Sequence, residues 1–149
     1  MPIHDLEGAL IAYGGRYLGD DPSEPKWLLP KGFQKRHCLF NAHRVAGASA
    51  VVLVEGFFDA IRFHGLGIPA VAVIGTAVAD EQVALLRTIG ARRVVVLFDG
   101  DTEGQAAVPD AVLALADAVS IRYGTLPVGT DPASAPEADL LAALGNLFF

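Results

Sequence analysis

Two stretches decide the fold: residues 50–59 read AVVLVEGFFD, and residues 93–104 read RVVVLFDGDTEG. Each begins as an unbroken apolar run rich in β-branched residues, which is typical of a strand covered on both faces. Each run then leads directly into an acidic turn that contains glycine, at residues 55–56 and 99–101. We therefore expect two buried parallel strands that carry carboxylates at their carboxyl ends.

The same alternation of apolar runs and helical patterns fills the chain from residue 50 onward. We predict strands at 50–54, 70–74, 93–98 and 119–123, and helices at 57–64, 80–89, 102–118 and 134–144. Pro109 should kink or restart the third helix, and Ser134 with Glu137 fits a capping box that opens the last one. This order predicts an α/β fold with a four-stranded parallel sheet and crossover helices.

Residues 1–47 have a different pattern, and we assign them to a small N-terminal extension, with a second domain at 48–149. Apolar segments at 2–4, 9–13 and 16–18 are separated by turn signals at 5–8 and at Gly14-Gly15, which predicts two or three short antiparallel strands. Residues 20–35 fit an irregular basic loop.

Charge divides the chain in the same way. Residues 14–47 contain six Lys and Arg against three carboxylates, a net charge of +3, whereas residues 48–149 contain five Arg against twelve carboxylates, a net charge of −7. The overall charge of −6 argues against a simple nucleic-acid binder, because phosphate affinity comes mostly from basic side chains. A basic extension joined to an acidic body indicates that the two parts have separate roles.

The composition limits the class of protein. The chain has 149 residues, 52% of them hydrophobic, which suits one compact domain, and its one Cys cannot form an internal disulfide. No apolar run approaches the ~20 residues of a membrane-spanning helix, and the first residues lack a signal pattern. We expect a cytoplasmic protein with no membrane role.

Acidic residues follow three of the predicted strands. Glu55 follows the first strand, Asp99 and Asp101 the third, and Asp131 lies in the loop after the fourth, so that all reach the sheet edge where ligands bind in such folds. Clustered carboxylates repel one another, and a bound cation relieves the repulsion. Oxygen ligands favour Mg²⁺ or Mn²⁺ over Zn²⁺ and therefore phosphoryl-transfer chemistry.

The roles of the individual residues stay open at this level. Glu55 could join the metal shell or act as a general acid or base. Gly100 would leave the backbone open to a phosphate. A lone Asp after a strand is most often a helix cap or turn residue, but two apolar strands that both end in acidic-glycine turns, 44 residues apart, favour a site. His37, Cys38 and His43 lack a fourth ligand, so we expect no zinc.

Residues 55–59 (EGFFD) and 99–104 (DGDTEG) resemble the two signature motifs of the Toprim domain, a family that includes DnaG-type primases, topoisomerases and nucleases. Gly75-Thr76 resembles the family's intervening turn, and Asp131-Pro132 resembles the acidic third site of primases. The resemblance implies a compact Rossmann-like fold. It implies that Glu55, Asp99 and Asp101 are the catalytic residues around Mg²⁺, with Asp59 and Asp131 as supporting metal ligands.

Details resemble the primase branch of that family. Phe58 stands where type II topoisomerases carry Ser, and residues 14–20 (GGRYLGD) with 25–28 (PKWL) resemble the stretch that precedes the Toprim domain in DnaG-type primases. In that stretch basic residues guide template and nucleotides. We expect nucleic-acid or nucleotide contacts at Arg16, Lys26, Lys31, Gly56, Gly75, Thr76 and Gly100.

The chain also departs from the primase pattern. Ala133 replaces the last carboxylate of the third acidic site, which implies that a second metal binds weakly or elsewhere. The zinc-binding and helicase-contacting parts of primases have no counterpart in the sequence. These departures indicate an excised domain or a small stand-alone relative, with a zinc-binding domain or helicase acting in trans or in a longer parent chain.

Three functions remain possible from the sequence. The first is Mg²⁺-dependent nucleotidyl transfer of the primase type, which joins nucleoside triphosphates into RNA primers on single-stranded DNA. The second is a small Toprim nuclease that hydrolyses phosphodiesters of DNA or RNA. The third is a non-catalytic nucleic-acid-binding module of a replication assembly.

Overall fold

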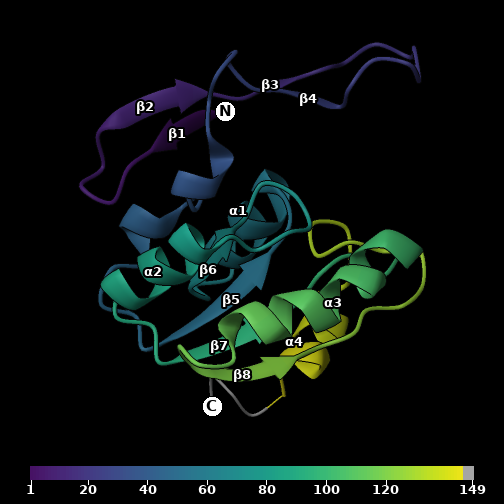
Figure 1. The fold of residues 1–149 in the computed structure, drawn as a ribbon. Coiled ribbons are helices and arrows are strands. Elements are labelled where there is room, and N and C mark those ends of the chain that lie inside the picture. Colours follow the sequence, from purple (N-terminus) through teal and green to yellow (C-terminus); the bar gives the residue numbers. More distant parts are fainter. Residues whose placement is uncertain (146–149) are drawn as a thin grey trace.

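A four-stranded parallel sheet forms the centre of the computed structural model, which describes residues 1–145 (Figure 1). The last four positions of the expected second domain therefore lie outside the described residues. The strands are β5 (Ala50–Val54), β6 (Ala70–Ala72), β7 (Arg93–Val96) and β8 (Ser120–Tyr123), in the order β6-β5-β7-β8. This arrangement confirms the predicted α/β fold class.

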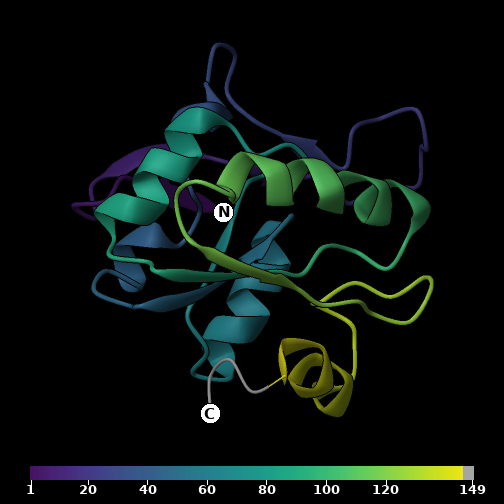
Figure 2. The ribbon, with the colours of Figure 1, turned by 60° about the horizontal axis from the view of Figure 1, so that its bottom comes forward.

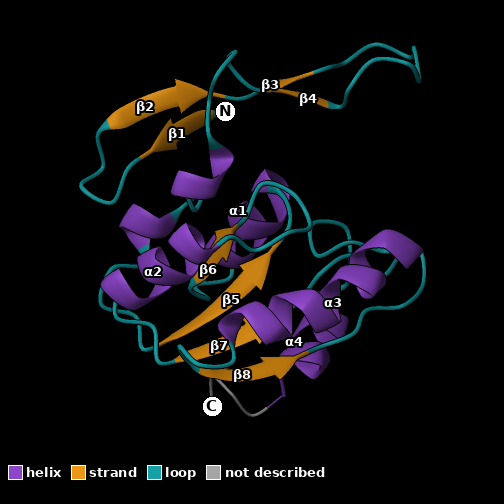
Figure 3. Ribbon diagram, in the orientation of Figure 1, coloured by secondary structure: helices purple, strands orange, loops and turns teal. Residues whose placement is uncertain are grey.

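Four helices cover the two faces of the sheet (Figures 2 and 3). They are α1 (Phe57–Gly65), α2 (Asp80–Thr88), α3 (Thr102–Leu115) and α4 (Glu137–Leu144). Alternate residues of β5 divide between two cores, because successive side chains of a strand point to opposite faces. Val52 and Val54 pack with α1 and α4, whereas Val51 and Leu53 pack with α2 and α3.

The N-terminal part forms two antiparallel ribbons beside the sheet (Figure 1). β1 (Pro2–His4) pairs with β2 (Leu10–Tyr13), and β3 (Gly15–Arg16) pairs with β4 (Trp27–Leu28). These ribbons confirm the predicted short antiparallel strands, but β2 and β3 do not form a hairpin with each other, since neither Gly14 nor Gly15 has the positive φ that a two-residue hairpin turn requires. The loop 20–35 therefore contributes a strand, and the division at residue 47 stays a prediction.

Short 3₁₀ helices connect the ribbons to the sheet. They are η1 (Lys35–His37) and η2 (Ala42–Arg44). Between them, Phe40 forms an antiparallel bridge with Ala72 and so covers the free edge of β6. This bridge places η1 beside the carboxyl end of the sheet.

Three local predictions were wrong. β6 ends at Ala72 rather than at residue 74, where Ile74 has a φ of +60°. α3 runs through Pro109, which is exposed, without the expected restart. Ser134 does not cap α4, because its hydroxyl is hydrogen-bonded to the Asp131 carboxylate and the helix begins only after Pro136.

Among the residues described, no helix combines the length and the apolar character needed to cross a membrane.

Candidate active site

A hollow of about 470 Å³ lies at the carboxyl ends of β5, β6 and β7, beneath the β3–β4 ribbon. Its walls combine three kinds of side chain. The acidic ones are Glu55, Asp59, Asp99 and Asp131, the basic ones are Arg16, Lys26 and Lys35, and the aromatic ones are Trp27, Phe57 and Phe58. The structure thus brings four of the five predicted metal ligands to one place.

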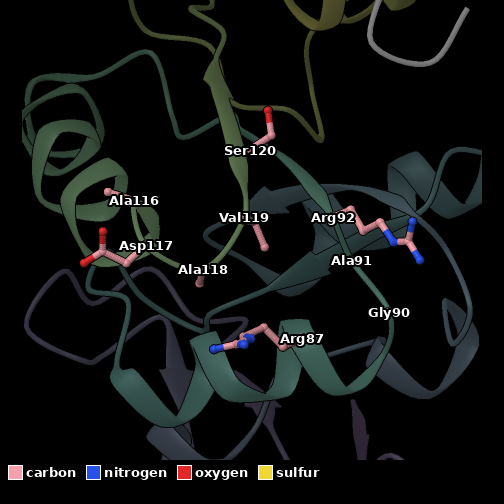
Figure 4. A pocket seen from close by; sticks show the side chains of 9 residues that line it. All are labelled: Arg87, Gly90, Ala91, Arg92, Ala116, Asp117, Ala118, Val119 and Ser120. Atoms are coloured by element: carbon pink, nitrogen blue, oxygen red, sulfur yellow. The ribbon is translucent and has the colours of Figure 1, made fainter.

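A larger hollow, about 620 Å³, lies at the opposite edge of the sheet, at the amino ends of β7 and β8. Figure 4 shows that Arg87, Arg92 and Asp117 are its charged side chains. None of the predicted site residues lines it. We therefore place the candidate site in the smaller hollow, where the reactive groups gather.

Glu55 and Asp99 are held together by the ends of neighbouring strands. The Asp99 backbone N–H donates to Glu55 Oε1 at 2.9 Å. Gly104 packs against both residues, because a Cβ at Gly104 would lie 2.6 Å from Glu55 Oε1 and 2.5 Å from the Asp99 carbonyl oxygen. Asp99 Oδ1 is buried and has no hydrogen-bond partner. An unpartnered buried carboxylate oxygen is costly unless a cation or proton binds it.

Asp59 joins α1 to the loop that contains Asp131. Its two carboxylate oxygens accept the backbone N–H of Gly56 at 2.9 Å and that of Ala133 at 3.0 Å. The Asp131 carboxylate in turn accepts from the Ser134 N–H at 2.7 Å and from the Ser134 hydroxyl at 2.6 Å. Both carboxylates therefore already order the backbone of the site.

Asp101 has a different position from the other acidic residues. Its carboxylate caps α3 by accepting the Gly104 N–H at 2.8 Å, and the residue is exposed and does not line the hollow. Asp101 therefore acts as a helix cap, which was one of the two roles that the sequence left open for it. Its charge still raises the pKa values of Glu55 and Asp99.

The electrostatics of the hollow favour a cation. Burial, and then the neighbouring carboxylates, raise the pKa of Glu55 to about 7, that of Asp59 to about 7 and that of Asp99 to about 6. Backbone hydrogen bonds to Glu55 and Asp59 oppose the increase in their pKa values, and the charge of Lys26 lowers the pKa of Asp99. Near neutral pH, ionisation of these three carboxyl groups is therefore unfavourable, and a bound cation would offset that free-energy cost.

The chemistry of the donors fits Mg²⁺. Within residues 1–145, no three His, Cys, Asp or Glu side chains converge as a ready-made metal site. Mg²⁺ does not need such a cage, because it is usually held by one or two carboxylates together with waters and substrate phosphates. Glu55 and the unpartnered Asp99 are the residues that would hold it.

Trp27 fixes the basic ribbon over the hollow. Its ring lies 4.6 Å from that of Phe57 and 5.4 Å from that of Phe58, measured between centroids. The Arg16 guanidinium lies 5.4 Å from the centroid of the Trp27 ring. Aromatic packing on α1 therefore holds Arg16 and Lys26 beside the acidic residues.

Only some of the other predicted nucleic-acid or nucleotide contacts lie at the hollow. Gly56 and Gly75 line the hollow, but Lys31 and Thr76 do not. Gly100 is not open to a phosphate, because its N–H donates to the Thr130 carbonyl at 2.8 Å and its carbonyl accepts from Gly129 at 3.2 Å. A Cβ at Gly100 would overlap with the Pro127 carbonyl oxygen, so this glycine allows close packing of the loop.

Lys35 is the charged residue of the hollow that is missing from the predicted site residues. A Cβ at Gly75 would lie 2.8 Å from Lys35 Nζ. The position of η1 depends on Gln82 of α2, which is 1% exposed and whose Nε2 donates to the carbonyls of Lys35, Cys38 and Val73 at 3.2, 2.9 and 3.0 Å. This buried amide, 47 residues away in the sequence, is a signal that could have indicated the placement of Lys35.

Comparisons with known proteins agree with the motifs. The family described as Toprim-like matches residues 52–135. The chain is 39% identical to a DNA primase of Synechococcus elongatus over 145 residues, which cover 88% of this chain and 21% of that protein. It is 36% identical to a DNA primase of Deinococcus radiodurans, with 91% and 25% covered. The chain thus spans a fifth to a quarter of the length of these relatives.

Solved structures give the same result. A DNA primase domain from Pseudomonas aeruginosa matches with a TM-score of 0.79 at 34% identity, with 93% of this chain and 46% of that one covered. A DnaG primase catalytic domain bound to single-stranded DNA matches with a TM-score of 0.74 at 31% identity, with 89% and 45% covered. The chain therefore belongs to the Toprim-like family, as a Toprim domain homologous to DnaG-type bacterial primases.

Proposed function

We propose that the chain provides a Mg²⁺-dependent nucleotidyl-transfer site of the primase type, which joins nucleoside triphosphates into RNA primers on single-stranded DNA. The observation that carries the proposal is the buried, unpartnered Asp99 Oδ1 beside Glu55, in a hollow that Lys26 and Lys35 also line. Such a hollow offers places for both a metal ion and the phosphates that the metal binds. The similarity to DNA primases supports this reading over other phosphoryl transfers.

Each residue of the site would have a distinct role in nucleotidyl transfer. Glu55 and Asp99 would hold Mg²⁺, which when bound would supply positive charge to offset that of the triphosphate. Lys26 and Lys35, which line the same hollow, would neutralise charge on the phosphates. Asp101 supports the site through the start of α3, and Asp59 holds the loop of Asp131 against α1.

Two other functions use the same site. A nuclease would use the metal to activate water, and Ala133, whose N–H binds Asp59 where primases have a further carboxylate, favours this second candidate. A non-catalytic binding module is the third, because the chain spans 21% to 25% of the relatives compared. We place each function in the cytoplasm, with a zinc-binding domain or a helicase as a partner in trans or in a longer parent chain.

One gel separates these functions. The protein is incubated with a single-stranded DNA template, labelled nucleotides and Mg²⁺ or Mn²⁺, and compared with Glu55→Gln, which keeps the oxygen that accepts the Asp99 N–H. Glu103→Gln is the control, because Glu103 is an exposed acid of the second motif that does not line the hollow.

Products longer than any input, present in the wild type and the control but lost in Glu55→Gln, are the expected result. Shortened products from a labelled strand, with the same dependence on Glu55, would contradict primer synthesis and establish a nuclease. Binding of single-stranded DNA without any product would contradict both catalytic functions and support the non-catalytic binding module.

A further inference from the structure

The two consecutive phenylalanines at the start of α1 have opposite environments. Phe57 is 1% exposed and packs edge-on against Phe40, with 4.8 Å between the ring centroids. Phe58 is 47% exposed and lines the hollow. Core packing therefore explains Phe57 but leaves a large apolar surface of Phe58 facing the charged site.

The position of Phe58 is restrained from one side. Its ring lies 5.4 Å from that of Trp27, with an angle of 53° between the ring planes. Trp27 is itself half-buried between Phe57 and the Arg16 guanidinium. Phe58 is thus an aromatic surface with a fixed support, adjoining the same space as Asp99 and Lys26.

We propose that Phe58, supported by Trp27, is the stacking surface for the nucleobase of a nucleoside triphosphate whose phosphates lie at the carboxylates and lysines of the hollow. The inference rests on the proposed function and names how the base is held. Every base has a π-face, so aromatic stacking holds bases with little dependence on sequence. The volume of about 470 Å³ falls within the usual range of small-ligand sites.

The test compares a ligand that has a base with one that lacks it. Calorimetric titrations with Mg·ATP and with Mg·tripolyphosphate are performed on the wild type, Phe58→Leu and Phe58→Tyr. Phe58→Leu keeps the apolar volume and removes the ring, whereas Phe58→Tyr keeps the ring. Ile61→Ala is the control, because Ile61 is 42% exposed on the same helix and does not line the hollow.

We expect Phe58→Leu to weaken ATP binding about 5-fold or more, which is the lower end of what a base–aromatic contact contributes. Tripolyphosphate binding should stay unchanged in this variant, and both affinities should be normal in Phe58→Tyr and Ile61→Ala. Trp27 is the only tryptophan, so its fluorescence should change with ATP more than with tripolyphosphate.

Three results would overturn the proposal. Equal loss of affinity for both ligands in Phe58→Leu would mean that the residue only supports the ribbon, and no loss of affinity for either would mean that the base of ATP does not contact it. Loss of oligothymidylate binding without loss of ATP binding would assign the surface to the template instead. Phe58→Met replaces the leucine variant if that variant does not fold.

The proposed function fails in a different way. If the wild-type protein binds neither ATP nor tripolyphosphate in Mg²⁺, the hollow is not a triphosphate site, and the inference about Phe58 falls with it.

Discussion

Glu55 is an acidic side chain whose charge opposes folding when no metal is bound. Burial raises its pKa from about 4.5 to about 7, so the cost of its charge is absent below the lower value and is complete above the higher one. Without metal, we expect Glu55→Gln to match the wild type near pH 4.5 and to be more stable at pH 8 by about 1–2 kcal/mol, after allowance for solvent screening. Urea unfolding in EDTA at the two pH values measures this difference.

Mg²⁺ should reverse the order of the two proteins. At pH 8 the ion should raise the melting temperature of the wild type and have little effect on Glu55→Gln, because the ion binds folded protein through a carboxylate that the variant lacks. Equal stabilisation of both by Mg²⁺ would show that Glu55 is not a ligand.

Gly104 tests how closely the two motifs are packed. Ala at this position would place its Cβ 2.6 Å from Glu55 Oε1 and 2.5 Å from the Asp99 carbonyl oxygen, so the acidic pair must shift. We expect Gly104→Ala to lower the free energy of unfolding by about 1–3 kcal/mol despite the better helix propensity of Ala. The control is Gly65→Ala, where a Cβ would contact nothing within 4 Å. Chemical denaturation of both variants checks this, and equal stability would contradict the packing argument.

At the level of elements, Gln82 connects α2 to η1 and to the end of β6. Replacing Gln82 by Met keeps its volume but leaves the carbonyls of Cys38 and Val73 without the Gln82 donor, whereas the Lys35 carbonyl still accepts the Cys38 N–H. We expect a loss of about 2–4 kcal/mol in the free energy of unfolding, since each unpartnered buried group costs about 1–3 kcal/mol. Hydrogen exchange at residues 35–38 should become faster, because η1 loses its anchor.

The ion pair between Arg36 and Glu81 is the matched control for Gln82. It joins the same two elements at 2.5 Å, but the Arg36 side chain is 57% exposed and that of Glu81 is 32% exposed, so Glu81→Gln should lower the free energy of unfolding much less than Gln82→Met does. An equal effect of the two substitutions would mean that surface charge, and not the buried amide, holds η1.

The elements also show how far a sequence can be interpreted. The four strands of the sheet, and the acidic residues that follow three of them, were predictable because apolar runs and strand ends are local features. The pairing of β3 with β4 was not, because Gly14 and Gly15 fit a hairpin turn that the chain does not form. Lys35 was missed for the same reason: its place depends on hydrogen bonds to a residue of a distant helix.

At the scale of the whole molecule, the distribution of charge should determine which part of the protein binds nucleic acid. The basic side chains Arg16, Lys26 and Lys35 line the hollow, whereas residues 48–149 carry a net charge of −7 from five Arg and twelve carboxylates. Single-stranded DNA should therefore contact the protein only through a few phosphates near the ribbon, and the acidic body should repel the rest of the strand.

This distribution predicts a shallow dependence of binding on salt. Three phosphate contacts give a slope of about −2 for log K against log salt concentration, at about −0.7 per phosphate of a single strand. Lys26→Gln should make the slope less negative by about 0.7. Arg122→Gln removes the same charge from β8, outside the hollow, and should leave the slope unchanged. Fluorescence anisotropy with a labelled oligothymidylate at several salt concentrations measures both slopes. An equal change in the two variants would show that DNA responds to net charge alone, and that the ribbon does not direct the strand to the hollow.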